Sequence, residues 1–383
     1  MAYSSVAGDD TGDPPGPPPG PGGGYGTGLS ATTLITTGTA LTEDGDVIMW
    51  GFRGSSQQGN GKMVVASKTE PTKVQSLSNI TQLTGGAYHL LALDENGNVY
   101  GWGQSGYGET GCTGFYVSTP CKVMGHATQI VAGEYWSGAL GEDGKVYTWG
   151  HNLYGQLGDG ASKNRSTPQA LNLSGETARL IGGAYEGGFA VTNQGHVWAW
   201  GDNEASGLGF QGPNYGVQRI VRTPTRVPNL DQYARDITYI AGGNGWGEAL
   251  LNDGRVIGWG LRAAIGWGTT STSSSSPEPI VVMDNVQKLF ARYVGSFALT
   301  NSGHLYTWGQ SGGSAFQMIY GEAPKLRFQL HGEVADIGGA KENLYYTTTD
   351  GKLYGIGYND LHKLDQSKCC APNIEWPGSE IRL

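Results

Sequence analysis

The sequence predicts an all-β fold, a seven-bladed β-propeller made of four-stranded antiparallel blades. Three observations support this prediction. A short word ending in Trp-Gly recurs about every 50 residues, a period typical of propellers and β-solenoids. Glycine is abundant, at 66 of 383 residues, and Tyr and Trp are frequent, at 20 and 11 residues. Short strands joined by glycine turns account for this composition, whereas long helices do not.

The recurring word predicts the second and third strands of each blade. Its seven copies are ALTEDGDVIMWG, ALDENGNVYGWG, ALGEDGKVYTWG, AVTNQGHVWAWG, ALLNDGRVIGWG, ALTNSGHLYTWG and TTTDGKLYGIG, which end at Gly51, Gly103, Gly150, Gly201, Gly260, Gly309 and Gly357. Ala-Leu ends one strand, Asp-Gly or a similar pair turns the chain, and Val-Tyr-x-Trp alternates along the next strand. Seven copies therefore predict seven blades.

The segments on either side of the word predict the first and fourth strands. Upstream lie apolar segments, most of which end in glycine, at 80–86, 128–133, 178–183, 237–243, 286–292 and 334–339. Glycine there suits close packing near a crowded axis. Downstream, each repeat has a proline, at Pro71, Pro120, Pro168, Pro224, Pro277, Pro324 and Pro372. Because proline cannot donate to a β-ladder, we expect these segments to form the outer edge strands.

The two ends of the repeat array predict how the ring closes. The first copy lacks a glycine strand, since Leu34 stands where Gly86 stands in the next copy. The chain ends in GSEIRL, where Leu383 aligns with Leu83. We therefore expect the C-terminal strand to pair into the first blade, which removes an exposed edge. Residues 31–383 then form one propeller domain.

Residues 1–30 differ from the rest of the chain. The run GDDTGDPPGPPPGPGGGYGTG contains proline and glycine with almost nothing to bury, so we expect a flexible, disordered tail. Its glycines keep no three-residue period, which excludes a collagen helix. Two roles stay open for this tail: a linker, or an anchor that becomes ordered when it docks into a larger assembly.

The repeated words, together with GQLGDG after Gly150, resemble the repeats of the RCC1 (regulator of chromosome condensation) family. The resemblance covers residues 31–383 and implies the propeller fold. It leaves the function open, because the family includes exchange factors, ubiquitin-ligase modules, bacterial inhibitors, effectors and virion proteins. Large bacteriophages carry tail or baseplate proteins with RCC1-like propellers.

Charge and targeting signals limit the classes of partner. The net charge is −9 and the pI about 5.3, so a broad basic surface for nucleic acid is missing. No run of about 18 apolar residues predicts a membrane span. The N-terminal MAYSSVAGDD lacks the features of a Sec signal. We therefore expect protein partners, no nucleic acid, and a virion or otherwise cytoplasmic location.

Cysteines and short motifs predict neither a metal site nor catalysis. Cys112, Cys121 and the pair Cys369 and Cys370 have no zinc-type spacing; a bridge between the first two and free thiols both stay open. The segment 101–106 matches GxGxxG, but a dinucleotide site needs a helix to begin at the last glycine, and here the repeat predicts a blade ending. No HExxH, GxSxG or P-loop occurs. We therefore expect a non-enzyme without a cofactor.

Two sets of residues are candidates for partner binding. The turns after the glycine strands contain Tyr88, His89, Tyr135, Trp136, Glu186 and Trp246. The longest connection, residues 202–236, adds Phe210, Tyr215 and Arg219. Equivalent turns of a propeller gather at one mouth of the ring, and Tyr and Trp are frequent in binding hot spots. The alternative is that several of these rings pack between blades.

The leading hypothesis is a non-enzymatic propeller that presents loops to a protein, a host surface receptor or a glycan. In this hypothesis it is a structural component of a phage virion, in the tail or baseplate, and acts in host attachment. The alternative is an intracellular RCC1-type guanine-nucleotide exchange factor or adaptor. A bacterial inhibitor or effector is a further alternative.

Overall fold

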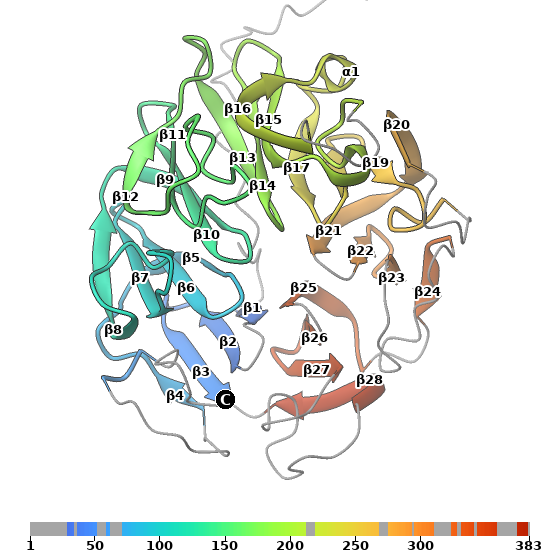
Figure 1. Cartoon of the computed structure of the whole chain (residues 1–383). Coiled ribbons are helices and arrows are strands. Elements are labelled where there is room, and N and C mark those ends of the chain that lie inside the picture. The colour runs from blue at the N-terminus through green and yellow to red at the C-terminus, as the bar shows by residue number, and fades with distance from the viewer. Residues whose placement is uncertain are drawn as a thin grey trace, which may run out of the picture.

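The computed structural model describes residues 29–33, 37–51, 59–61, 71–211, 219–267, 275–292, 295–309, 323–327, 331–340, 343–357 and 374–381. Within these residues seven four-stranded antiparallel sheets follow one another along the chain. Figure 1 shows them as blades of a ring, with the first strands towards the centre and the fourth strands at the rim. The predicted seven-bladed propeller is confirmed.

Each blade uses four consecutive strands. The first strands are β1 (Leu29–Thr33), β5 (Ile80–Gly85), β9 (Ala127–Ala132), β13 (Ala178–Ala184), β17 (Ile237–Gly242), β21 (Val286–Arg292) and β25 (Val334–Ala340). The second strands are β2 (Thr37–Thr42), β6 (His89–Asp94), β10 (Trp136–Gly141), β14 (Gly187–Thr192), β18 (Trp246–Leu251), β22 (Gly295–Thr300) and β26 (Asn343–Thr348).

The outer half of each blade follows the same order. The third strands are β3 (Val47–Gly51), β7 (Val99–Gln104), β11 (Val146–Gly150), β15 (Val197–Asp202), β19 (Val256–Leu261), β23 (Leu305–Trp308) and β27 (Leu353–Gly357). The fourth strands are β4 (Thr72–Lys73), β8 (Tyr116–Met124), β12 (Arg165–Ala170), β16 (Ile220–Arg226), β20 (Ser275–Met283), β24 (Lys325–Arg327) and β28 (Ile374–Ile381). Two short helical turns also occur: Glu204–Ser206 lies between β15 and β16 of blade four, and α1 (Pro228–Asp231) lies between β16 and β17, where blade four leads to blade five.

Two backbone positions explain why the repeated word keeps its glycines. The hairpin glycine, such as Gly144 with φ 72°, takes the left-handed conformation that tight two-strand turns require. The glycine after tryptophan also has a positive φ, which is 109° at Gly150. A Cβ on Gly150 would lie 2.7 Å from the Tyr135 carbonyl oxygen. Both positions therefore exclude larger residues.

The core consists of apolar clusters at the interfaces between neighbouring blades. The cluster between blades four and five includes Phe189 and Trp259, whose rings meet edge to face at 5.7 Å. The tryptophan of the word also donates its indole N–H to the preceding blade. These bonds run from Trp149 Nε1 to Glu109 O (3.0 Å), from Trp200 Nε1 to Gln156 O (2.8 Å) and from Trp259 Nε1 to Gly207 O (2.9 Å). Each such tryptophan therefore joins two blades.

The ring closes differently from the sequence prediction. β28 pairs with β27, so the C-terminal strand is the rim strand of blade seven, and β1 is the inner strand of blade one. Ala31 pairs with Ala40 as Leu83 pairs with Ala92 in blade two, so β1 fills the inner position without a terminal glycine. β1 also contacts β25, which closes the ring by packing (Figure 1).

The apolar character of GSEIRL has another explanation. Ile381 packs with Trp50 and Tyr345 in the cluster between blades one and seven, while its backbone pairs with Leu353. Leu29 and Ser30, which the sequence placed in the tail, belong to β1. The remainder of the predicted tail lies outside the described residues.

This closure predicts unequal effects for deletions at the two ends. A chain that begins at Leu29 keeps β1, and a chain that begins at Thr37 loses it. We expect the second chain to be less stable by more than about 4 kcal/mol, because blade one loses its inner strand and β25 its neighbour. Urea unfolding followed by tryptophan fluorescence measures the difference. If the shorter chain unfolds at the same urea concentration, β1 does not close the ring.

Candidate partner-binding face

The antiparallel order gives the ring two faces, each made of different connections. The turn between the first and second strands and the loop between the third and fourth lie at the same end of each blade. We call this end the loop face, and the opposite end, with hairpins such as 95–98 and 142–145, the hairpin face. In blades two to five the described turns and loops of this face are residues 86–88, 133–135, 185–186, 243–245, 105–115, 151–164, 203–211, 219 and 262–267.

Backbone hydrogen bonds fix the turns and loops to one another. In four blades the amide near the end of the third strand donates to the turn at 2.9 Å: Gln104 N to Tyr88 O, His151 N to Tyr135 O, Asp202 N to Glu186 O, and Leu261 N to Gly245 O. Neighbouring turns are also joined, from Ala87 N to Glu134 O (2.8 Å) and from Glu134 N to Tyr185 O (3.1 Å). The turns of blades two to four therefore form one continuous surface.

Exposed large apolar side chains gather on this face. Among the described residues they are Tyr107, Phe115, Tyr116, Leu153, Trp267 and Val281. The first five lie in third-to-fourth loops or at the loop end of β8, and only Val281 lies lower on a rim strand. Tyr107 is 41% exposed and Leu153 53% exposed. Grouped exposed apolar residues of this kind are typical of interaction surfaces.

Five rings of blades two and three form a continuous aromatic patch. It consists of Tyr88, Tyr107, Tyr135, His151 and Tyr154. The ring of Tyr107 lies 5.4 Å from Tyr135 and 4.4 Å from His151, and Tyr88 stacks on Tyr135 at 6.4 Å. Burial lowers the pKa of His151, which favours the neutral imidazole at pH 7.

The loop ends of blades two to four also contain carboxylates. Glu109, Glu134, Glu186, Asp202 and Glu204 lie on the loop face of blades two to four. Burial, followed by the charges of Asp202 and Glu134, raises the pKa of Glu186 to about 8, although Arg219 opposes the shift. Burial likewise raises the pKa of Tyr135 to about 12, and Glu134 adds to it. Glu134 therefore contributes to the pKa of groups in blades three and four.

Arg219 forms ion pairs with two of these carboxylates. Its guanidinium bonds both carboxylate oxygens of Asp202, and its Nη2 lies 2.9 Å from Glu204 Oε2. The hydrogen bonds to Asp202 raise the pKa of Arg219. The positive charge of Arg219 is therefore committed to Asp202 and Glu204.

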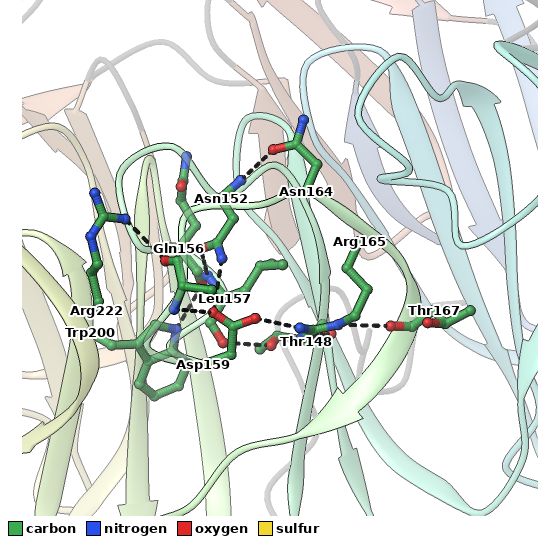
Figure 2. A network of polar contacts seen from close by, with 11 residues as sticks. Thr148, Asn152, Gln156, Leu157, Asp159, Asn164, Arg165, Thr167, Trp200 and Arg222 are labelled. Atoms are coloured by element: carbon green, nitrogen blue, oxygen red, sulfur yellow. Dashed lines mark hydrogen bonds and ion pairs between the residues drawn. The ribbon is translucent and has the colours of Figure 1, made fainter.

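Polar bonds hold the blade-three loop, residues 151–164, in one conformation (Figure 2). Asn152 Nδ2 donates to Asp159 Oδ1 at 2.9 Å, and Arg165 forms an ion pair with the same carboxylate. Burial opposes ionisation of Asp159, but the hydrogen bonds of Ala161, Asn152 and Arg165 hold its pKa below the usual value. The glycine-rich GHNLYGQLGDG is therefore a braced loop that presents Leu153 and Tyr154.

The blade-two loop is held by a disulfide. Cys112 and Cys121 are bonded, with their Cα atoms 6.3 Å apart, within the usual range for a disulfide. Of the two alternatives that the sequence left open, the structure has the bridge. It joins the loop of Tyr107 to the rim strand β8. Cys369 and Cys370 lie outside the described residues.

Some of the residues that the sequence predicted for partner binding lie on the loop face, and others lie in the core. Tyr88, Tyr135, Glu186 and Arg219 lie on the loop face within blades two to four. Phe210 packs against the core between blades four and five. Tyr215 lies outside the described residues. These four residues therefore lie on the same face as the exposed apolar side chains, and their role in partner binding stays a prediction.

Three of the nominated residues are in the core, which corrects their assignment to the surface. His89, Trp136 and Trp246 are each buried to 1% exposure or less. Each is the first residue of a second strand and points between blades. His89 Nε2 lies 2.9 Å from Ser137 Oγ, and Trp136 Nε1 donates to Ala184 O at 3.2 Å. The packing alternative holds for these residues.

Sequence reasoning missed the other half of the surface. Tyr107, Glu109, His151 and Tyr154 follow the Trp-Gly pair, in segments that the repeat explained as turns. The antiparallel strand order places these segments at the same end as the first-to-second turns. The sequence predicts this antiparallel strand order, so the order is the signal that could have located these residues.

The described part of the chain lacks the features that a metal site and a GxGxxG dinucleotide site need. No group of three or more His, Cys, Asp or Glu residues there is placed to hold a metal ion. The GxGxxG segment runs from β7 into a loop of turns and bends, without the helix that a dinucleotide site needs. Among these residues no helix has the length and apolarity to cross a membrane.

Family models match several of the repeats. The model of the regulator of chromosome condensation (RCC1) repeat matches residues 44–93, 143–182 and 194–246. A second model with the same description matches residues 80–109 and 127–156. The matched residues include all five rings of the aromatic patch.

Curated relatives and solved structures show the same likeness. The chain is 29% identical to protein pim1 of Schizosaccharomyces pombe, over 71% of this chain and 44% of that protein. It is also 29% identical to the RCC1 domain-containing protein RUG3, mitochondrial, of Arabidopsis thaliana, over 71% and 63%. It thus spans about half the length of these relatives. The crystal structure of Prp20p from Saccharomyces cerevisiae matches with a TM-score of 0.72 at 20% identity, over 88% of this chain and 86% of that one.

Proposed function

The chain belongs to the RCC1-like repeat β-propeller family, and on this basis we propose that it is a non-enzymatic protein-binding module whose partner docks on the loop face. The gathering of exposed aromatic and apolar side chains on that face is the observation that supports the proposal. Tyr is among the residues enriched in binding hot spots. The braced loops present Tyr107 and Leu153 without the cost of ordering a flexible segment.

The relatives favour an intracellular adaptor over the virion role. Prp20p is described with binding properties to Gsp1p and histones, and RUG3 is named as mitochondrial. None of the relatives described above supports a virion, a host receptor or a glycan. The proposal therefore follows the alternative stated from the sequence, a protein-binding role inside the cell.

Site-specific photocrosslinking tests the docking face. A benzoylphenylalanine is placed at Leu153, which is exposed on the loop face, or at Glu142, which is exposed on the hairpin face. We expect Leu153 to crosslink one defined protein from an extract of the source cells, and Glu142 not to. Equal crosslinking from both positions, or none from Leu153, would contradict the proposal. A crosslinked virion protein would restore the virion hypothesis.

A guanine-nucleotide exchange factor is the second candidate, because the RCC1 family, whose repeat model matches this chain, includes exchange factors. If the crosslinked partner is a small GTPase, it is loaded with a fluorescent GDP and mixed with the chain. Faster release of GDP would indicate an exchange factor. Unchanged release with retained binding would indicate an adaptor.

A further inference from the structure

We infer that the proline-rich segment 14–21 of this chain docks on the aromatic patch of its own propeller and covers it when no partner is bound. The segment lies outside the described residues. Three features support the docking: the residues of the segment, its distance along the chain from β1, and the surface of blades two to four. The inference goes beyond the proposed function, because it names what a partner has to displace.

The segment has the composition of a polyproline II helix. Residues 14–21 read PPGPPPGP. A polyproline II helix has three residues per turn, a rise of about 3.1 Å per residue and no internal hydrogen bonds. At that period Pro15, Pro18 and Pro21 share one side of the helix, about 9 Å apart. Because the prolines already restrict the free chain, docking this segment costs less conformational entropy than docking an ordinary one.

The aromatic patch has the chemistry that recognises such a helix, since proline-rich segments dock on surfaces lined by aromatic rings. Neighbouring rings of the patch lie 4.4–6.4 Å apart. The planes of Tyr107 and Tyr135 differ by 72°, and those of His151 and Tyr154 by 70°. Rings that meet at such angles leave part of a face open, and Tyr107 is 41% exposed. Proline rings can therefore pack on the patch without displacing the core.

Charge complementarity gives the segment a direction. The residues just before it, 9–13, read DDTGD and carry three aspartates. Lys163 is exposed in the blade-three loop, and the Arg222 guanidinium donates to the carbonyl oxygens of Leu153 and Ala161. Among the described residues no carboxylate forms an ion pair with either cation. The acidic end of the segment is therefore attracted to blades three and four.

Two buried carboxyls of this face do little to repel the aspartates at neutral pH. Burial raises the pKa of Glu109 to about 7, although backbone hydrogen bonds oppose the shift. Burial also raises the pKa of Glu186 to about 8. At pH 7 about half of Glu109 and most of Glu186 therefore carry a proton.

The segment can reach the patch from its own β1. Leu29 pairs with Thr42, which begins the hairpin of blade one, so β1 starts at the hairpin face. The five residues of β1 span about 17 Å. Residues 22–28, five of which are glycine, can span at most about 25 Å. They are therefore long enough to run back beside β1 to the loop face.

The order of these groups along the segment matches their order around the ring. Blade one contacts blade two, whose turn contains Tyr88 at one end of the patch. Tyr154 lies at the other end, in the blade-three loop, and Arg222 lies beyond it on β16 of blade four. A segment that arrives from β1 therefore meets the rings with Pro21 first, and its aspartates come last, beside Lys163 and Arg222.

Fluorescence anisotropy with a labelled synthetic peptide of residues 9–21 tests the inference. The peptide is titrated with the full chain and with a full-length variant that carries Pro15→Ala, Pro18→Ala and Pro21→Ala. We expect the variant to bind the peptide about five-fold more tightly, because the tethered segment of the wild type competes at a high effective concentration. No binding to the variant, or equal affinity for variant and wild type, would overturn the inference.

A matched variant shows whether the side of the helix matters. It loses three other prolines, through Pro14→Ala, Pro17→Ala and Pro19→Ala, and keeps the side that docks. We expect it to bind the peptide within about two-fold of the wild type. Peptide affinity raised as much as in the first variant would overturn the assigned side. Wild-type dimers in sedimentation that the first variant lacks would place the segment on a neighbouring copy and overturn docking on its own propeller.

Further substitutions locate the site, each added to the first variant. Tyr107→Ala should weaken peptide binding about five-fold, whereas Trp267→Ala, which removes an exposed ring of the loop face outside the patch, should change it less than about two-fold. Thermal unfolding confirms that each variant is folded. Equal affinities for these two variants would overturn the location.

The aspartates are tested by a second peptide, with asparagine at positions 9, 10 and 13. We expect it to bind more weakly than the first peptide at low salt, and high salt to remove the difference. Equal binding of both peptides at low salt would overturn the assigned direction of the segment.

The inference and the proposed function fail separately. If Leu153 crosslinks a partner but the peptide does not bind, the docking face stands and the segment does not cover it. If the proline substitutions raise the affinity for the peptide but Leu153 captures nothing, the contact of the segment stands and the proposed docking of a partner is wrong.

Discussion

Replacing Trp200 by alanine is expected to lower the free energy of unfolding by about 3–5 kcal/mol, the usual cost of removing a large buried ring. Trp200 is 1% exposed and lies in the cluster between blades three and four. Its indole N–H donates to Gln156 O, so the change also leaves that buried carbonyl without its donor. A Cβ on Gly188 would lie 2.6 Å from the Trp200 ring, which shows how closely the neighbouring strand packs on it.

Equilibrium urea unfolding measures the effect of Trp200→Ala. Trp267→Ala is the matched control, because Trp267 lies exposed on the loop face, and we expect this change to cost less than about 1 kcal/mol. Trp200→Phe should fall between the two, since it keeps most of the volume but not the donor. Equal losses for Trp200→Ala and Trp267→Ala would show that the tryptophan of the repeated word does not hold neighbouring blades together.

Raising the pH is expected to destabilise the protein through Glu248, and Glu248→Gln is expected to remove this effect. Glu248 lies fully buried on β18, between blades five and six. Its Oε1 accepts from Trp308 Nε1 at 2.7 Å and its Oε2 from Ser296 Oγ at 2.6 Å. Burial raises its pKa from 4.5 to about 8, although both hydrogen bonds oppose the shift.

The direction of the pH effect follows from this shift. Between pH 4.5 and 8 the folded protein keeps the Glu248 proton, while the unfolded chain releases it. Stability from this group is therefore complete below that window and falls through it, by about 1.4 kcal/mol for each pH unit. Glutamine keeps both hydrogen bonds, since its oxygen accepts from Trp308 and its amide donates to Ser296, but it cannot ionise.

Urea unfolding of both proteins at two pH values checks this prediction. We expect Glu248→Gln to be within about 1 kcal/mol of the wild type at pH 5, and more stable by several times that amount at pH 8.5. Other titrating groups change both proteins alike, so the difference between them isolates Glu248. A difference that does not grow with pH would mean that Glu248 ionises in the folded protein as it does in water.

The blades could be predicted from the sequence because their backbone conformation requires glycine at fixed positions of each repeat. The glycines at positions such as Gly144 and Gly150 are required by positive φ, and they recur with the period of the fold. Ring closure has no comparable pattern in the sequence. β1 forms the inner strand of blade one without the glycine found at or near the end of most of its counterparts, and Ile381 is apolar because it packs between blades one and seven.

The surface could be predicted only in part, since adjacent residues of a turn have opposite environments. Tyr135 lies in the aromatic patch, whereas Trp136, the first residue of β10, is buried between blades. Residue type alone predicted that both Tyr135 and Trp136 lie on the binding surface. Tyr107 and His151 belong to the same surface, but they meet only when two neighbouring blades pack side by side. That contact depends on tertiary structure, which the repeat pattern does not specify.

Hydrogen–deuterium exchange of the free chain and of its complex with the isolated partner is the most direct test of the central claim, that the loop face of blades two to four is the binding surface. The account predicts slower exchange on binding in residues 105–115, 133–135 and 151–164, with no change in the hairpins at 95–98 and 142–145. Slower exchange in those hairpins, with the three loop segments unchanged, would contradict it.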